Sequence, residues 1–217
     1  MIFSKSIAFD DEEIGRAVVS AHHALDRSAE EALFIDKLKA GDAAAFETLI
    51  DRYSADIYAL LLRLTENAEE AGDLTQDTFL RALRSIKSFR GASEIKTWLF
   101  RIAINESRNR FRWWKRRKRD LTISIDAHIA GSEKTLGDTL SDDSISPEDE
   151  ALIREREDAL KTALLDIPDV YREAIMLCDV EGLNYEETAA ALGVGIGTVK
   201  SRISRGREDL RRRLKDF

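Results

Sequence analysis

Asp73, Gln76 and Asp77 lie within five positions of one another and share one face of a predicted helix. Paired carboxylates can act as an acid and base couple, for example in hydrolysis. Nothing nearby supplies a nucleophile or a set of metal ligands, and no Cys and His cluster has the spacing of a zinc site. An exposed cluster of acids and an amide, with the apolar Leu80 among them, suits docking against a basic helical partner better. We therefore predict a protein-binding face, with no catalytic residue, no metal and no cofactor.

A second group of chemically useful residues lies between positions 97 and 119, where arginines recur at helical spacing. One sector of this helix carries Arg101, Asn105, Arg108 and Arg112. Trp98 borders that sector, and we favour a place in the core for it over stacking on bases. For Trp113 and Trp114 both interpretations, core packing and base stacking, remain open. Cations that bind phosphates, interleaved with rings that stack on bases, are typical of a surface for single-stranded nucleic acid.

A helix-turn-helix is predicted near the C-terminus. Residues 185–192 form a short helix that ends at Gly193, with Asn184 as its cap and Glu187 positioned to complete a capping box. A basic helix begins near position 197, and its outward side and flanks carry Thr198, Lys200, Ser201, Arg202, Ser204 and Arg205. Basic helices are usually solvated surfaces, but the second helix of such a motif lies in the major groove, where arginine and hydroxyl groups read bases and phosphates.

The elements that must position these residues are all helical. Apolar residues keep a helical period from Phe46 to Leu64, with Ile50 among them, and Leu83 is expected on the buried face of its helix. Ser28 with Glu31 forms a capping-box pattern that opens a helix before residue 41. Further helices are predicted at about 69–86, 97–119, 147–165, 169–180, 185–192 and 197–215. The fold class is therefore all-α, with two small helical domains.

Charge is distributed along the chain in blocks of opposite sign. The 217 residues include 34 Lys and Arg against 41 Asp and Glu, and a net charge of −7 by itself argues against DNA as a partner. However, residues 111–119 carry +6 and residues 198–217 carry +5, on the two helices that are suited to nucleic acid. The acid is concentrated in residues 1–36 (−5) and 120–159 (−9). DNA therefore remains a possible partner, and the acidic segments are expected to face basic protein surfaces.

Composition narrows the class of protein further. A lone Cys178 excludes an intramolecular disulfide framework. No apolar run approaches the roughly 18 residues that a membrane span needs, and the N-terminus turns acidic too soon for a signal peptide. We expect a soluble cytoplasmic protein that does not insert into membranes.

Two groups of motifs carry a resemblance to a known family. The runs DLTQDTF at 73–79, FRG at 89–91 and TWLFRIAIN at 97–105 resemble the N-terminal domain of bacterial extracytoplasmic-function (ECF) sigma factors, of the sigma-70 family. Their C-terminal domain is resembled by IPDVYREA at 167–174, DVEG at 179–182, YEETA at 185–189 and GTVKSR at 197–202. The match covers roughly residues 40–119 and 147–215, in the order expected.

The resemblance implies a promoter-specificity subunit of RNA polymerase that melts promoter DNA and is not an enzyme. By similarity, Asp73, Gln76 and Asp77, with Leu80 beside them, would contact the clamp helices of the largest polymerase subunit. Loop 88–96, including Arg90, and Asn105 would read an unpaired, flipped base of the −10 element, with Trp98, Arg101, Arg108 and Arg112 on the same surface. The −35 element would face Thr198, Lys200, Ser201, Ser204 and Arg205, with Arg202 and Arg207 on phosphates. An anti-sigma factor is an expected partner.

The expected organisation has four parts. Residues 1–36 form an acidic extension, 37–119 the N-terminal sigma domain, 120–146 a flexible acidic linker and 147–217 the helix-turn-helix domain. Such a chain should bind promoter DNA poorly alone and well on polymerase. Two other hypotheses remain open: a free-standing helix-turn-helix regulator, and a helical hydrolase that uses Asp73, Asp77 and a bound metal.

Overall fold

A computed structural model describes residues 29–120 and 147–215 of the chain. All regular structure in these two ranges is helical, which confirms the all-α prediction. The predicted linker, apart from Asp120, and most of the acidic extension, including the capping Ser28, lie outside the described residues.

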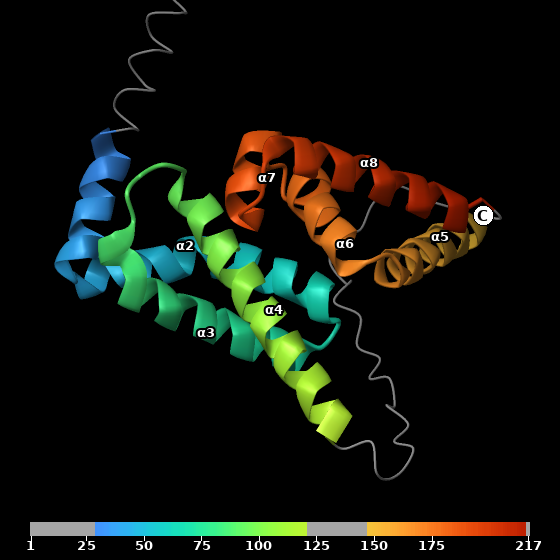
Figure 1. Cartoon of the computed structure of the whole chain (residues 1–217), viewed down its shortest axis with the longest axis horizontal. Coiled ribbons are helices and arrows are strands. Elements are labelled where there is room, and N and C mark those ends of the chain that lie inside the picture. The colour runs from blue at the N-terminus through green and yellow to red at the C-terminus, as the bar shows by residue number, and fades with distance from the viewer. Residues whose placement is uncertain (1–28, 121–146, 216–217) are drawn as a thin grey trace, which may run out of the picture.

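The N-terminal half consists of helices that follow one another closely (Figure 1). They are an unlabelled helix over 29–40, α2 (Ala43–Thr65), α3 (Ala68–Ser85), the short 3₁₀ turn η1 (Ile86–Ser88) and α4 (Ile95–Asp120). Side-chain caps begin two of them: Asp42 accepts from the backbone N–H groups of Ala44 and Ala45, and Asn67 from that of Glu70. The polar residues before α2 and α3 therefore set where each helix begins.

The core of this half follows the predicted apolar stripes with two exceptions. Fully buried side chains come from α2, α3 and α4, among them Leu49, Leu60, Leu74, Leu99 and Phe100. Ile50 and Leu83, expected on buried faces, are instead 41% and 49% exposed. Those two predictions were wrong because a stripe at helical spacing is wider than the strip that the neighbouring helix covers.

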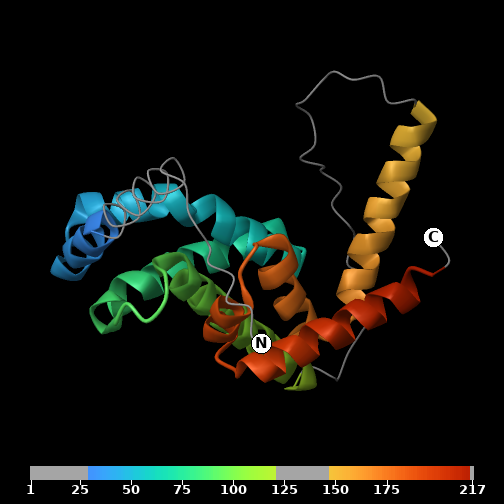
Figure 2. The same ribbon diagram turned by 90° about the horizontal axis from the view of Figure 1, so that it is seen from above.

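The C-terminal half contains α5 (Pro147–Asp166), α6 (Asp169–Ile175), the π-helical turn η2 (Met176–Val180), α7 (Tyr185–Leu192) and α8 (Ile196–Arg213). Figure 2 shows α5 extending away from the other helices, while α8 runs along the outside of this half. The observed bounds agree with the predicted helices to within about two residues.

Gly206 allows α8 to lie directly against α6. A Cβ atom at this position would lie 2.7 Å from Cδ1 of Ile175 and 3.1 Å from Cβ of Tyr171. Both distances are too short for ordinary packing, so only glycine fits without movement of the neighbouring side chains. The close approach of these helices fixes where α8 lies.

The two halves also pack against each other. Helix α7 lies against α4, and the buried apolar side chains of both halves form one continuous cluster (Figure 1). The alanine-rich sequence of α7 leaves little side-chain bulk to hold the helices apart. The sequence patterns predict two domains but contain no sign of this contact between them.

Candidate partner and nucleic-acid interfaces

The acid and amide cluster lies on the exposed face of α3. Asp73, Gln76, Asp77 and Leu80 are all exposed, as predicted from the helical spacing. Arg110 of α4 forms an ion pair with Asp77 at 3.2 Å and approaches Asp73 at 4.0 Å. No sequence pattern indicated Arg110, which lies 33 positions from Asp77. The guanidinium of Arg110 offsets part of the negative charge of Asp73 and Asp77. The uncharged Gln76 and Leu80 take no part in these ion pairs.

An apolar groove of about 620 Å³ runs beside this cluster, between α2 and α3. Phe46 and Ile50 line one side, and Phe79, Leu80 and Leu83 line the other. Gln76 also lines it, so the groove and the polar cluster form one surface. The exposure of Ile50 and Leu83 is thus part of a continuous apolar strip.

The residues predicted for the −10 element lie along α4 and the loop before it. Arg90, Arg101, Asn105 and Arg112 are exposed, whereas Arg108 is only partly exposed. Trp98 is partly buried against the core, with its ring centre 5.2 Å from that of Phe89. The favoured core position of Trp98 is therefore confirmed, and Phe89 anchors the loop before α4 against it.

Arg108 is bound by a glutamate of the other half. Its Nε donates to Oε1 of Glu173 at 2.8 Å and its Nη2 to Oε2 at 2.5 Å. Only 8% of the Glu173 side chain is exposed. The hydrogen bond that Arg108 donates to Glu173 raises the pKa of Arg108 against the opposing effect of burial. No sequence pattern indicated this role for Glu173, which lies 65 positions away inside a family motif.

A cleft of about 440 Å³ adjoins this ion pair. Asn105, Phe111 and Arg112 of α4 line one wall, and Val170 and Arg172 of α6 line the other. Two carboxylates, those of Asp169 and Glu173, also face the cleft. The predicted base-reading asparagine therefore opens onto a space that the C-terminal half closes on one side.

A second ion pair joins the halves at 2.8 Å, between Arg63 of α2 and Glu181 beyond η2. Burial raises the pKa of Glu181, and the nearby Arg63 opposes that shift only in part. The positive partner therefore does not fully offset the cost of removing this carboxylate from water.

Trp113 and Trp114 lie near the C-terminal end of α4 and are 43% and 49% exposed. Their rings meet edge to face, with centres 5.4 Å apart. Because both side chains are this exposed, neither tryptophan lies in the core.

The helix-turn-helix has the predicted form. Asn184 and Glu187 form the expected capping box at the start of α7, and Gly193 ends that helix with φ +67°, a conformation that favours glycine. On α8, the residues Thr198, Lys200, Ser201, Ser204 and Arg205 are exposed, and Arg202 is partly buried. Val199 and Ile203 on the opposite side are buried. The polar face of α8 is thus available to a partner.

Arg207 of α8 is held by an acid from outside that helix. Its Nε and Nη2 donate to the two carboxylate oxygens of Asp179 at 3.0 and 2.5 Å. These hydrogen bonds raise the pKa of Arg207. A phosphate contact by Arg207 would have to compete with Asp179.

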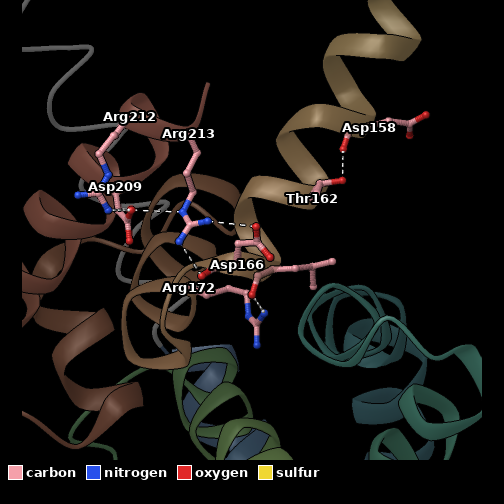
Figure 3. A network of polar contacts seen from close by, with 8 residues as sticks. Asp158, Thr162, Asp166, Arg172, Asp209, Arg212 and Arg213 are labelled. Carbon is pink, nitrogen blue, oxygen red and sulfur yellow. Dashed lines mark hydrogen bonds and ion pairs between the residues drawn. The ribbon is translucent and has the colours of Figure 1, made fainter. Parts of the chain in front are cut away.

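Arg213 connects the C-terminal end of α8 to α5 (Figure 3). It donates to the backbone carbonyl and a carboxylate oxygen of Asp166, both at 3.1 Å, and to Asp209 at 3.2 Å. Arg172 donates to the backbone carbonyl of Leu165 at 3.2 Å in the same region. The contacts of Arg213 with Asp166 hold the C-terminal end of α8 against α5, and no sequence pattern identified Arg213.

Among the residues that the structure describes, no three His, Cys, Asp or Glu side chains are placed to hold a metal ion. The described helices also include none long and apolar enough to cross a membrane.

Family models match both halves of the chain. Residues 49–119 match Sigma-70 region 2, and residues 157–210 match Sigma-70 region 4. The first match covers α3, α4 and most of α2, and the second covers the helix-turn-helix.

Curated relatives match nearly end to end. The chain is 38% identical over 184 residues to the ECF RNA polymerase sigma factor SigW of Bacillus subtilis, which covers 84% of this chain and 96% of SigW. It is 35% identical over 180 residues to the RNA polymerase sigma-H factor of Pseudomonas aeruginosa, covering 83% and 91%.

Solved structures give the same result. The sigma factor RpoE of Bartonella quintana, in complex with the anti-sigma factor NepR, matches with a TM-score of 0.60 at 30% identity, covering 78% of this chain and 96% of RpoE. CnrH, in complex with the cytosolic domain of CnrY, shares the fold at 21% identity and a TM-score of 0.60, covering 86% and 97%. Fold, motifs and relatives agree, and the chain belongs to the extracytoplasmic-function sigma factors of the sigma-70 family.

Proposed function

We propose that this chain directs core RNA polymerase to specific promoters and assists their melting, without catalysis of its own. The observation that carries the proposal is the presence of Sigma-70 regions 2 and 4 in one chain, in order, across most of the length of curated sigma factors. We place its action in the cytoplasm, where polymerase and promoter DNA are found.

Docking on polymerase is assigned to the exposed face of α3. Asp73, Gln76 and Asp77 offer hydrogen-bond acceptors to a basic helix, and Leu80 offers an apolar contact at the edge of the groove. Helices with basic and apolar stripes fit such a surface, and the clamp helices of the largest polymerase subunit are the partner we assign to it.

The −10 element is assigned to α4 and the loop before it. Asn105 has the donor and acceptor that can read the edge of a flipped base, while Arg90, Arg101, Arg108 and Arg112 can bind the strand's phosphates. Trp98 is assigned to positioning this loop through its contact with Phe89.

The −35 element is assigned to the exposed face of α8. Lys200, Ser201, Ser204 and Arg205 would reach the major groove, with Thr198 and Arg202 on its flanks. Because Asp179 holds Arg207, we assign Arg207 to positioning α8, with phosphate contact only where that pair opens.

An anti-sigma factor is the proposed regulatory partner. The support is that the Bartonella quintana relative was solved in complex with one. We also propose the domain bounds predicted above, with residues 37–119 binding polymerase and the −10 element and residues 147–217 binding the −35 element.

Run-off transcription with core polymerase tests the function. The expected result is promoter-dependent transcripts from a library of templates when the chain is added and none from core enzyme alone. Absence of such transcripts, with tight operator binding by the free chain, would favour a free-standing regulator instead. That alternative leaves the region 2 match over residues 49–119 without a role.

A further inference from the structure

We propose that an open cleft between α3 and α4, beside Trp113, binds one unpaired guanine of the promoter strand that Asn105 reads. The inference rests on the proposed role of α4 in binding the −10 element. It adds a second base-binding site on the same helix. This site uses Glu106, Asn109 and Trp113, to which the proposed function gives no role.

The cleft lies where α3 and α4 pack against each other (Figure 1). Its volume is about 550 Å³, within the range of about 300–1,000 Å³ that is usual for small-ligand sites. From α3 it is lined by Leu74 and Asp77. The residues of α4 that line it are Glu106, Asn109, Arg110, Arg112 and Trp113. The cleft therefore follows directly after Asn105 along the helix.

The charges around the cleft suit an uncharged ring better than a phosphate group. Asp77 is bound by Arg110 at 3.2 Å, so the charges of these two side chains largely offset each other. The other charged residues that line the cleft, Glu106 and Arg112, are also of opposite sign. A phosphate would gain little in such surroundings, whereas Trp113, which is 43% exposed, offers an aromatic surface on which a base can stack.

Hydrogen bonding on α4 determines which polar groups the cleft can offer to a base. Nη2 of Arg112 donates to Oδ1 of Asn109 at 2.7 Å. Because arginine only donates, the amide oxygen of Asn109 is occupied and its amino group is left to donate to a ligand. Glu106 lies three positions earlier on the same side of the helix, and an ionised carboxylate only accepts. The cleft thus presents two acceptor oxygens next to a donor.

Guanine matches this arrangement along its Watson–Crick edge. That edge carries two adjacent donors, the N–H groups at N1 and N2, followed by the acceptor O6. The carboxylate of Glu106 can accept both N–H groups at once, in the two-pronged manner in which carboxylates bind arginine, and Asn109 can donate to O6. The other three bases place an acceptor beside their donor, so one carboxylate oxygen would face an acceptor. In a duplex this edge is paired, so only an unpaired guanine can be read in this way.

Arg112 connects this cleft with the surface that Asn105 faces. It lines both the cleft beside Trp113 and the cleft beside Asn105. Its Nε donates to the backbone carbonyl of Arg108 at 3.3 Å, and its Nη2 is bound to Asn109. Nη1 takes part in neither bond and can bind a phosphate oxygen. One strand can therefore place a base at Asn105, a phosphate at Arg112 and a guanine at Trp113.

The test is run-off transcription by core polymerase with the full chain, on templates randomised on both sides of the −10 element. A barcode in the transcribed part identifies each template when the transcripts are sequenced. Guanine should be enriched at least about fivefold at one flanking position. Glu106→Gln should reduce this enrichment to less than about twofold, because one acceptor becomes a donor, and leave the preferences at other positions unchanged.

Glu30→Gln is the matched control, since it removes the same charge from an exposed position of the same half. It should keep the enrichment of guanine, and circular dichroism checks that each variant folds. Equal enrichment with the unmodified chain and with folded Glu106→Gln would overturn the proposal.

Base analogues show whether the guanine is read unpaired. They are placed at the preferred position of templates already mismatched there, so that the strength of pairing does not enter. Inosine, which lacks the 2-amino group, should reduce transcription by about threefold or more. 7-Deazaguanine, which lacks only the N7 acceptor, should be used as well as guanine. The opposite pattern would mean that the base is read in the major groove of a duplex, and the proposal would be wrong.

Trp113 provides an independent test of stacking. Trp113→Ala should reduce transcription from guanine-containing templates by about fivefold at limiting amounts of the chain, and Trp113→Phe should restore most of it, because phenylalanine keeps an aromatic surface. Surface plasmon resonance measures the affinity of both variants for core polymerase without DNA, which should be unchanged. A loss of that affinity in Trp113→Ala would assign the ring to a protein contact and overturn the proposal.

The same transcription experiment separates this inference from the function on which it rests. Transcription by the unmodified chain without any preference for guanine beside the −10 element would refute the site and leave the sigma function intact. If core polymerase produced no transcript with the unmodified chain, the sigma function itself would be refuted.

Discussion

Helices α4 and α8 are both rich in arginine, yet their proposed DNA-reading faces have different surroundings. On α8, Lys200, Ser201 and Arg205 are exposed to solvent. On α4, Arg108 is bound by Glu173, and α6 of the other half closes one side of the neighbouring cleft. Sequence and charge make the two helices look equivalent, whereas the fold leaves one face open and covers part of the other. Availability of a nucleic-acid surface is thus set by tertiary contacts as much as by composition.

The largest expected effect concerns the support of the open face. Gly206→Val should destabilise the chain by about 1–3 kcal/mol and weaken binding to duplex DNA, because the new side chain overlaps Ile175 and Tyr171. Urea unfolding measures the free energy. Gly72→Ala, where an added Cβ meets nothing within 4 Å, should leave stability unchanged or raise it by up to about 1 kcal/mol. Similar losses for both variants would show that α8 does not depend on its close contact with α6.

The next prediction separates base reading from phosphate binding on the open face. If Arg205 donates to a guanine, Arg205→Ala should reduce affinity by about 1–3 kcal/mol for −35 duplexes that contain that base pair. Binding measured across a set of single-base variants of the duplex gives the pattern. Arg211→Ala removes the same charge from a position where Glu208 already binds the arginine. A uniform loss across all duplexes for Arg205→Ala would make it a phosphate contact instead.

The docking face on α3 should be independent of both DNA-reading faces. Gln76→Ala combined with Asp77→Ala should weaken binding to core polymerase by roughly tenfold, about 1.4 kcal/mol, and leave duplex binding by the free chain unchanged. Surface plasmon resonance with immobilised core enzyme measures this affinity. Asp51→Ala, at an exposed position of α2, serves as the control. Unchanged affinity in the double variant would remove the docking assignment.

The smallest effect is expected at the second contact between the halves. Burial raises the pKa of Glu181, so this carboxylate is harder to ionise in the folded chain than in the unfolded one. The contribution of Glu181 to stability is therefore greatest below its ordinary pKa, about 4.3, and is lost as the pH rises through the raised value.

Glu181→Gln should accordingly leave stability at pH 4 unchanged and raise it at pH 7, by no more than about 0.5 kcal/mol because Arg63 offsets part of the penalty. Urea unfolding at the two pH values measures the difference. A marked loss of stability at pH 7 would mean that the Arg63 ion pair holds the halves together as firmly as the Arg108 pair.

Sequence patterns predicted the helices well because the start, end and buried face of a helix depend on residues that are close together in the chain. The caps at Asn184 and Gly193 and the alternation of buried Val199 with exposed Ser201 follow from helix geometry alone. Contacts between distant segments could not be predicted in this way. Glu173 and Arg108 are 65 positions apart, and either residue alone looks like an ordinary surface charge. The helical stripe also misplaced Leu83, because it does not reveal where a groove interrupts the packing of α2 against α3.

The distance between the halves in the free chain tests the central claim most directly. Spin labels at Arg84 of α3 and Glu208 of α8, both exposed, with Cys178→Ser to prevent labelling elsewhere, allow it to be measured by double electron–electron resonance. The account predicts one short distance population in the unmodified chain and a partial shift to longer distances in Glu173→Gln. A broad distribution of longer distances in the unmodified chain would contradict it.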